Sequence, residues 1–247
     1  MESIYREEFK ITTAAVDRFG RLKSSWLLYF CQQVAGTHSA LLQANLTLPE
    51  HRHLFWAIIR NRVQITRLPR ENEVITVETW PMPTTRVAYP RATVAFDRQG
   101  QELFRCISLW VLMDRESRAM VLPGKSGVTV PGLVRGNELD TPANLALAQL
   151  EHHSYRQAGF SDLDVNGHVN NTKYLDWIDD LLPSAFHQAH PVREISICYL
   201  SEILEGQHLD LTWELQDGPC IRVDAHRNQD ESDTKKERAF SARVLFA

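Results

Sequence analysis

Residues 163–169 read Leu-Asp-Val-Asn-Gly-His-Val, and a related heptapeptide, Val-Asp-Arg-Phe-Gly-Arg-Leu, occupies residues 16–22. The two lie 147 positions apart, and both keep an aspartate, a glycine and aliphatic ends. This combination is typical of a tight turn, because aspartate accepts hydrogen bonds from nearby backbone N–H groups and glycine adopts positive φ. A turn that recurs once indicates a chain built from two similar halves.

The same order of elements follows each turn. Apolar residues spaced by three and four predict one helix with a buried face in each half. In the first half they are Trp26, Leu27, Phe30, Val34 and Leu41. In the second they are Tyr174, Leu175, Ile178, Leu181 and Leu182, with Pro183 as the expected stop. Alternating segments after each helix predict several strands, so the order strand, helix, strands occurs twice.

Glycine and proline mark the border between the halves. Seven of the 22 such residues lie between positions 119 and 150, a density typical of a linker. We therefore expect an N-terminal domain over residues 1–136, a linker over 137–147 and a C-terminal domain over 148–247. An amphipathic helix and a one-sided antiparallel sheet bury each other. The expected fold class is α+β, a double hotdog in which each domain is a long helix wrapped by a curved sheet.

Composition excludes several classes of protein. The 247 residues are 43% hydrophobic and 23% charged, which is typical of a globular chain with a sizeable core. A net charge of -4 gives no global basic field, so no nucleic acid partner is expected. The apolar runs are shorter than the roughly 20 residues that span a bilayer. The first ten residues lack a signal-peptide core, and the four cysteines form no CxxC pair. We expect a cytoplasmic protein with no membrane span.

Three side chains of the second turn could serve one reaction. Asp164, Asn166 and His168 precede the predicted helix, and alternate residues of an extended segment would face one cavity. Backbone N–H groups at the helix start would suit a developing oxyanion. On spacing alone, a structural turn with an incidental histidine is the plainer interpretation. The first half favours function, because Phe19 and Arg21 replace the asparagine and histidine there without loss of the turn residues.

The stretch Asp164-Val-Asn-Gly-His-Val-Asn-Asn-Thr-Lys-Tyr174 resembles the Asp-x-Asn-x-His-Val-Asn-Asn-x-Lys-Tyr signature of the acyl-acyl carrier protein (acyl-ACP) thioesterases of plants and bacteria. The resemblance covers nearly the whole chain. It implies a double-hotdog enzyme that hydrolyses fatty acyl-ACP, releasing free fatty acid and terminating fatty acid synthesis. Its partner would be ACP carrying a fatty acyl-phosphopantetheine, and no metal or organic cofactor is implied.

The resemblance also implies a fourth catalytic residue. The family's Tyr-x-x-Glu falls on Tyr199 and Glu202, on the strand expected after the second helix. Arg70, 132 positions earlier, is its expected counterpart in the first half. The implied catalytic set is Asp164, Asn166, His168 and Glu202. A water activated by Glu202 with His168 would attack the thioester carbonyl, although Asp164 and Glu202 could exchange roles as base.

The cysteine that follows this glutamate in some relatives is Ile203 here. Cys198, four residues upstream of Glu202, is expected to be a small buried residue and not a nucleophile. The histidine pairs of the chain have no recognised zinc spacing, so no metal site is expected.

If the second half supplies the chemistry, the first half is expected to bind the acyl chain in an apolar slot. The candidates are Trp26, Leu27, Phe30, Phe55, Trp56 and Ile58. Because ACP is acidic, local arginines are candidates for docking it, namely Arg60, Arg62, Arg67 and Arg70. Alternating arginines on a strand are at least as typical of a solvated face.

Three alternatives remain at this point. An acyl-CoA thioesterase on the same fold is the nearest one, and a non-catalytic acyl-binding double hotdog comes from another class. A hotdog dehydratase ranks third, because it needs a hydroxyacyl or unsaturated substrate. The sequence leaves open the length and branching of the acyl chain, and whether two copies form a homodimer.

Overall fold

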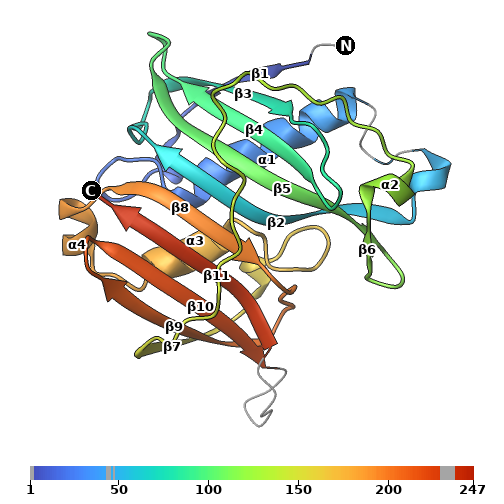
Figure 1. Cartoon of the computed structure of the whole chain (residues 1–247). Coiled ribbons are helices and arrows are strands. Elements are labelled where there is room, and N and C mark those ends of the chain that lie inside the picture. The colour runs from blue at the N-terminus through green and yellow to red at the C-terminus, as the bar shows by residue number, and fades with distance from the viewer. Residues whose placement is uncertain (1–2, 43–45, 47, 229–236) are drawn as a thin grey trace. The chain divides into compact units, whose positions relative to one another are not determined.

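The computed structural model describes residues 3–42, 46, 48–228 and 237–247. The chain divides into two compact units, Met1–Pro142 and Ala143–Ala247, called here the first and the second unit. Each consists of antiparallel strands and few helices (Figure 1), so the fold class is α+β. Among the described helices, none combines the length and the apolar character that crossing a membrane requires.

The first unit contains one long helix and a sheet. Its strands are β1 (Tyr5–Lys10), β2 (Leu54–Ile65), β3 (Val74–Pro81), β4 (Tyr89–Phe96), β5 (Glu102–Asp114) and β6 (Met120–Val121). Its helical segments are η1 (Thr13–Ala15), α1 (Ser24–Leu41), η2 (Pro49–His51) and α2 (Pro123–Ser126). The strands follow the order β1-β3-β4-β5-β2, and β6 pairs with β5.

Helix α1 packs on one face of this sheet (Figure 1) because its apolar residues recur every three or four positions. Leu27, Val34 and His38 are buried on this face. Leu41, expected there, is 57% exposed, whereas Leu42 is buried. Leu42 lies four residues after His38 and therefore continues the buried face. Leu41 is one residue earlier, so its side chain is rotated by about 100° from that of Leu42.

The second unit repeats the strand order of the first. Its strands are β7 (His152–Gln157), β8 (Val192–Tyr199), β9 (His208–Gln216), β10 (Cys220–Asn228) and β11 (Glu237–Phe246). Its helical segments are η3 (Phe160–Asp162), α3 (Lys173–Asp179) and α4 (Ser184–Ala189). The strands follow the order β7-β9-β10-β11-β8, all antiparallel.

The expectation of a long helix in both halves is wrong for the second unit. Helix α3 has only seven residues. After Asp179 the backbone tightens to bonds between residues three apart, at Leu181 and Leu182, and Pro183 has no N–H to continue a helix. Tyr174 is nevertheless buried, so the short helix still covers its sheet.

Both turns that opened the sequence analysis have the same backbone geometry. Gly20 and Gly167 donate to the carbonyls of Asp17 and Asp164, at 2.9 and 3.0 Å. Each aspartate N–H in turn donates to the carbonyl four residues later, at 2.7 and 2.8 Å. The two glycines have φ of +71° and +77°, where other residues are strained. The geometry of the turn therefore requires the aspartate and the glycine, whereas the residues between them can differ.

Residues 127–151, called here the outer segment, form no helix or strand and include the expected linker. They are nonetheless bound to the sheets, on the face opposite the helices (Figure 1). In the first unit, Leu133 donates its N–H to the Pro81 carbonyl at 2.8 Å. In the second, Ala148 donates its N–H to the Asp224 carboxylate at 3.0 Å. The segment is part of both units and not a loose tether.

Asp224 holds the second unit's share of the outer segment. Its side chain is fully buried and accepts hydrogen bonds from Arg238 at 2.9 Å and from Ser241. Arg222, at 3.3 Å from the same carboxylate, and Arg238 also donate to carbonyls of the outer segment. Burial lowers the pKa of Arg222 although the charge of Asp224 acts in the opposite direction. The carboxylate thus compensates the charge of the buried Arg222 and of the partly buried Arg238, which would otherwise be costly to remove from water.

We expect Asp224→Asn to lower the free energy of unfolding by about 3 kcal/mol, because it leaves buried arginine charge uncompensated. Urea unfolding followed by fluorescence measures the change. The matched control is Asp217→Asn, an exposed turn residue, which should shift stability by no more than about 0.5 kcal/mol. Equal effects of the two variants would contradict the assigned role of Asp224.

Candidate active site

The second turn presents its three candidate side chains differently from the expectation. Asp164 accepts the N–H of Asn166 on its carboxylate at 2.8 Å, and the chain reverses at Gly167. The segment is therefore a turn and not an extended strand, so the expected alternation of side chains is wrong. Asn166 lies exposed at the tip, whereas Asp164 and His168 are partly buried at its base.

Glu202 is brought to this turn by a buried neighbour. Ile203 is fully buried, and its carbonyl accepts the N–H of Val169 at 2.9 Å. Glu202 lies beyond the end of β8 and not on the strand, and its Oε2 is 3.4 Å from Nε2 of His168. The His168 side chain is 21% exposed and that of Glu202 43%, so the pair is accessible to water. The structure thus brings His168 and Glu202 together.

Tyr174, the last residue of the 164–174 stretch, was not among the predicted site residues. Its ring is buried and packs on Tyr199 at 5.5 Å between ring centroids. Burial raises the pKa of Tyr174, and the negative charges of Asp164 and Glu202 raise it further. The phenol therefore lies within electrostatic reach of both candidate carboxylates. Its position at the end of the 164–174 stretch was the signal that could have identified it.

The equivalent turn of the first unit is closed by an internal ion pair. Arg21 donates to the Asp17 carboxylate at 3.0 Å, and its guanidinium lies 4.8 Å from the centre of the Phe19 ring. Asp164, by contrast, has no ion pair within the part of the chain that the structure describes. The same turn therefore carries a neutralised carboxylate in the first unit and an unneutralised one in the second.

The prediction that Arg70 is the counterpart of Glu202 in the first unit is wrong. The aliphatic residue that ends each turn donates its N–H to the carbonyl of Pro69 in the first unit and of Ile203 in the second, at 2.8 and 2.9 Å. This bond fixes an offset of 134 positions, not 132. Leu68, and not Arg70, therefore corresponds to Glu202.

The backbone N–H groups before α3 are already occupied. Thr172 donates its N–H to the side-chain oxygen of Asn170 at 3.0 Å, and Lys173 donates to the carbonyl of the same residue at 2.9 Å. The first helical residue is five positions beyond His168. The expected contribution of helix-start N–H groups to an oxyanion site is therefore not part of the arrangement described below.

Cys198 is buried on the sheet face opposite the one that contacts α3. Its thiol lies 3.6 Å from the carbonyl of Ala143 in the outer segment, whereas the next residue, Tyr199, packs on Tyr174. All four cysteines are free and buried. Within the described ranges, no cluster of three or more histidine, cysteine or acidic side chains could hold a metal ion.

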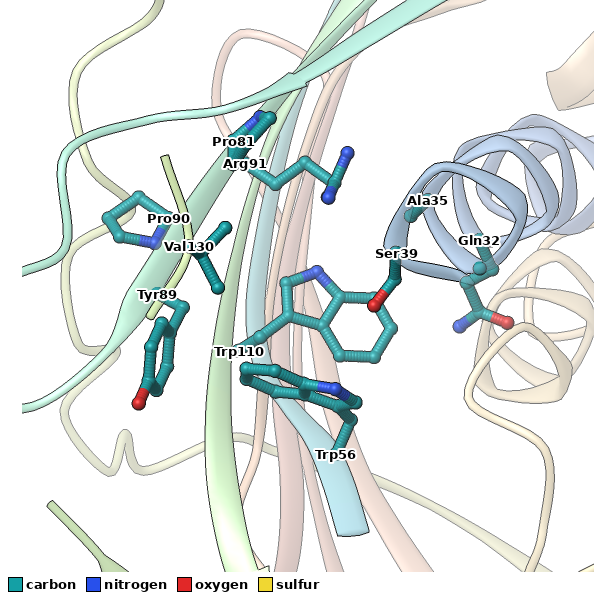
Figure 2. Close-up of a pocket in the computed structure, with 11 residues that line it drawn as sticks. Gln32, Ala35, Ser39, Trp56, Pro81, Tyr89, Pro90, Arg91, Trp110 and Val130 are labelled. Carbon is teal, nitrogen blue, oxygen red and sulfur yellow. The ribbon is translucent and has the colours of Figure 1, made fainter. Parts of the chain in front are cut away.

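The first unit contains a pocket of about 230 Å³ between α1 and the sheet (Figure 2). Its sheet side is mainly apolar and consists of Trp56, Pro81, Tyr89, Pro90 and Trp110, together with Val130. Its helix side consists of Gln32, Ala35, Gly36 and Ser39. Arg91 of β4 adds a positive charge to this apolar lining.

Of the six residues expected to line an acyl slot, Trp56 lines this pocket. Leu27, Phe30 and Ile58 are buried in the core instead. Trp26 packs on Phe30, and Phe55 lies beneath two arginine guanidinium groups. Trp110 and Arg91 were missed, because periodicity predicts which side chains face inward but not where a gap remains between them.

The four candidate docking arginines have different surroundings. Arg60 donates to the Pro142 carbonyl at 3.3 Å, and Arg62 lies 4.0 Å from Asp140. Arg67 forms a two-pronged pair with Glu73, at 2.8 and 3.0 Å. Arg70 is exposed. Three of the four thus bind groups of their own unit.

Two family models match the chain. The acyl-ACP thioesterase N-terminal domain matches residues 2–122, and the acyl-ACP thioesterase C-terminal domain matches residues 146–242. Oleoyl-acyl carrier protein thioesterase 1 of Arabidopsis thaliana, a chloroplastic protein, is 22% identical over 231 residues, which are 83% of this chain and 62% of that protein. The chain spans less than two thirds of the length of the curated relatives it matches.

Solved structures show the same fold over the whole chain. An acyl-ACP thioesterase from Bacteroides thetaiotaomicron superposes with a TM-score of 0.88 at 22% identity, covering 99% of this chain and 98% of that one. The 12:0-ACP thioesterase from Umbellularia californica gives a TM-score of 0.83 at 21% identity, covering 100% and 98%. At these identities the likeness establishes the architecture.

Proposed function

The chain belongs to the acyl-ACP thioesterase family, and from this premise we propose that it hydrolyses the thioester of fatty acyl-ACP and releases the free fatty acid. The observation that carries the proposal is the pairing of His168 Nε2 with Glu202 Oε2, at 3.4 Å, beside the Asp164 turn. A carboxylate next to an imidazole is the arrangement that general-base activation of water requires.

In this proposal the two units are the two domains of a double hotdog, and they divide the work. The repeated turn bonds and the shared strand order support a common ancestry of the units. The second unit carries the reaction, because its turn has Asn166 and His168 where the first has Phe19 and Arg21. The first unit binds the acyl chain, and its apolar pocket supports that role.

The reaction consumes one water molecule. Glu202 accepts a proton from the water, with His168 as hydrogen-bonding or proton-shuttling partner, and the oxygen attacks the thioester carbonyl. The tetrahedral intermediate then collapses, the carbon–sulfur bond breaks, and the proton returns to the phosphopantetheine sulfur. The products are a free fatty acid and ACP with its thiol restored.

The exposed Asn166 amide would hold the thioester carbonyl oxygen as it gains negative charge. Asp164 orients the amide from below, because its carboxylate already binds the Asn166 backbone N–H at 2.8 Å. The phenol of Tyr174 is buried and lies within electrostatic reach of both carboxylates. Asp164 has the same charge as Glu202 and remains the second candidate for the base.

Docking of ACP is assigned to positive charge on the first unit. Arg70 is the most suitable of Arg60, Arg62, Arg67 and Arg70, because it is exposed and forms no ion pair with the described residues. The other three bind groups of their own unit and offer less charge to a partner. Each ion pair between exposed charges contributes little affinity, so docking would depend on several such pairs.

We expect Glu202→Ala and His168→Ala each to lower kcat/KM on acyl-ACP by about 100-fold or more, because each removes one half of the general-base pair. Asn166→Ala should reduce kcat by about 100-fold through loss of an oxyanion donor. Asp164→Ala should also reduce turnover. The measurement is release of free fatty acid from acyl-ACP.

Cys198→Ala and Arg21→Ala are the matched controls for these variants, and both should keep most of the activity. Near wild-type turnover in Glu202→Ala would reject Glu202 as the base. Parallel assays on matched ACP and CoA thioesters distinguish the proposed carrier from its nearest alternative. A higher kcat/KM on the CoA thioester would contradict the choice of ACP.

We expect Gly36→Leu to shift hydrolysis toward shorter acyl chains. Gly36 lines the pocket, and a Cβ there meets no atom within 4 Å, so a leucine should narrow the pocket without a clash near the backbone. Leucine is a better helix former than glycine by about 0.8 kcal/mol, so the fold should not suffer. The control is Gln33→Leu on the exposed side of the same helix. An unchanged chain-length profile over a panel of acyl-ACPs would contradict this use of the pocket.

A further inference from the structure

The pocket of the first unit contains a buried positive charge that the proposed reaction does not use. Arg91 is 8% exposed, and its guanidinium donates to Nδ1 of His38 at 3.2 Å and to Oγ1 of Thr79 at 3.3 Å. Arginine has no acceptor, so Nδ1 of His38 must accept and the ring proton must be on Nε2. His38 is then neutral, as is Thr79. Neither partner balances the charge.

No carboxylate within the described part of the chain forms an ion pair with Arg91. Burial lowers the pKa of Arg91 to about 10, so the group is still a cation at neutral pH. A buried cation without a counter-charge costs several kcal/mol. In the second unit, Asp224 compensates the charge of the buried Arg222 and of the partly buried Arg238. Arg91 therefore lacks a compensating carboxylate such as the one that Asp224 provides in the second unit.

A second donor lies at the same end of the pocket. Nε1 of Trp110 is buried and has no hydrogen-bond partner among the residues that the structure describes. Figure 2 shows this nitrogen on the edge of the indole that faces Arg91, and Ser39 of α1 lines the same pocket. The remainder of the lining is mainly apolar, apart from Gln32 and Ser39 of α1, and Trp56 and Tyr89 are stacked edge to face. The pocket thus combines apolar walls with one positively charged, donor-rich corner.

We propose that this pocket binds an aliphatic chain whose buried end carries a carboxylate, with Arg91 as its counter-charge. Guanidinium groups pair with carboxylates through two parallel hydrogen bonds, and the pairing is strongest away from water. The apolar walls contact the methylene groups. The volume, about 230 Å³, lies below the range of roughly 300 to 1,000 Å³ of common ligand pockets, which favours a short chain.

Two sources present this chemistry. One is a free fatty acid, such as the product of hydrolysis, bound by its own carboxylate. The other is an acyl group on a carrier with a second carboxylate at its far end. The second source rests on the function proposed above, whereas binding of a free carboxylic acid does not depend on it.

The first experiment measures binding of decanoate and of decanol by calorimetry, using the full chain. The two ligands have the same chain length and differ in charge. Wild-type protein should bind decanoate at least tenfold more tightly than decanol, and Arg91→Gln should abolish that preference. Arg91→Lys should keep part of it. Arg86→Gln, which removes an exposed arginine, is the matched control and should change neither affinity.

Trp110→Phe tests the same site while Arg91 stays in place, so its result does not depend on whether the Arg91 variants fold. It removes the unpartnered N–H and keeps an aromatic ring, so it should weaken decanoate binding several-fold and leave decanol unchanged. Gly36→Leu should weaken both ligands, because it fills the pocket. Equal affinity of the wild-type protein for decanoate and decanol would overturn the proposal. So would an unchanged decanoate preference in folded Arg91→Gln.

A second experiment separates the two sources. If the ligand is a free fatty acid, decanoate should inhibit acyl-ACP hydrolysis, and Arg91→Gln should relieve the inhibition. If it is a substrate end, an acyl-ACP with a terminal carboxylate should be hydrolysed faster than the plain acyl-ACP of equal length, and Arg91→Gln should reverse that order. A protein that binds decanoate through Arg91 but hydrolyses neither substrate would refute the proposed function and leave the site intact.

Discussion

A left-handed glycine three residues after an aspartate closes the same turn in both units, and the candidate site depends on it. The aspartate fixes the turn through its backbone and its carboxylate, and the glycine provides a conformation that other residues adopt only with strain. Since these two residues suffice, the positions between and after them are released from a structural role. The first unit fills them with Phe19 and Arg21, and the second with Asn166 and His168.

A buried residue beyond the end of a strand accepts the bond from each turn and so determines which side chain lies beside it. In the second unit Ile203 accepts the bond from the end of the turn and so brings Glu202 to His168. In the first unit the equivalent bond is accepted by Pro69, so Leu68 occupies the position that corresponds to Glu202. Arg21 neutralises Asp17 there. One backbone arrangement thus supports an open acidic site in one unit and a closed, neutral turn in the other.

Much of this could be predicted from the sequence, because repeated turns and the 164–174 stretch are local signals. The helix length of the second unit could not, since the apolar spacing continues to Leu182 although the α-helix ends at Asp179. The offset of Glu202 was misjudged by two positions, because a shift of two leaves the alternating pattern of a strand unchanged and only the bond at Ile203 fixes the register. The sequence could not show that three of the four candidate docking arginines bind groups of the first unit, because those partners lie far from them in the sequence or on other elements of the fold.

The pocket was the least predictable feature. It is formed by one helix and residues from several strands and from the outer segment, and a sequence pattern reports burial but not empty space. Arg91 would be read from sequence as an ordinary strand arginine with a solvated end. Its burial beside His38 and Thr79 is a tertiary property, and so is the lack of charge compensation around it.

The most direct test of the divided roles compares Gly20→Ala with Gly167→Ala. A Cβ at either glycine meets no atom within 4 Å, and both have positive φ, so each variant should lose a similar 1 to 2 kcal/mol, approximately, from backbone strain alone. Hydrolysis of acyl-ACP should then be measured at equal folded fraction. The account predicts that Gly167→Ala loses most of its turnover and Gly20→Ala keeps it. Equal losses in the two variants would contradict the assignment of the chemistry to the second turn.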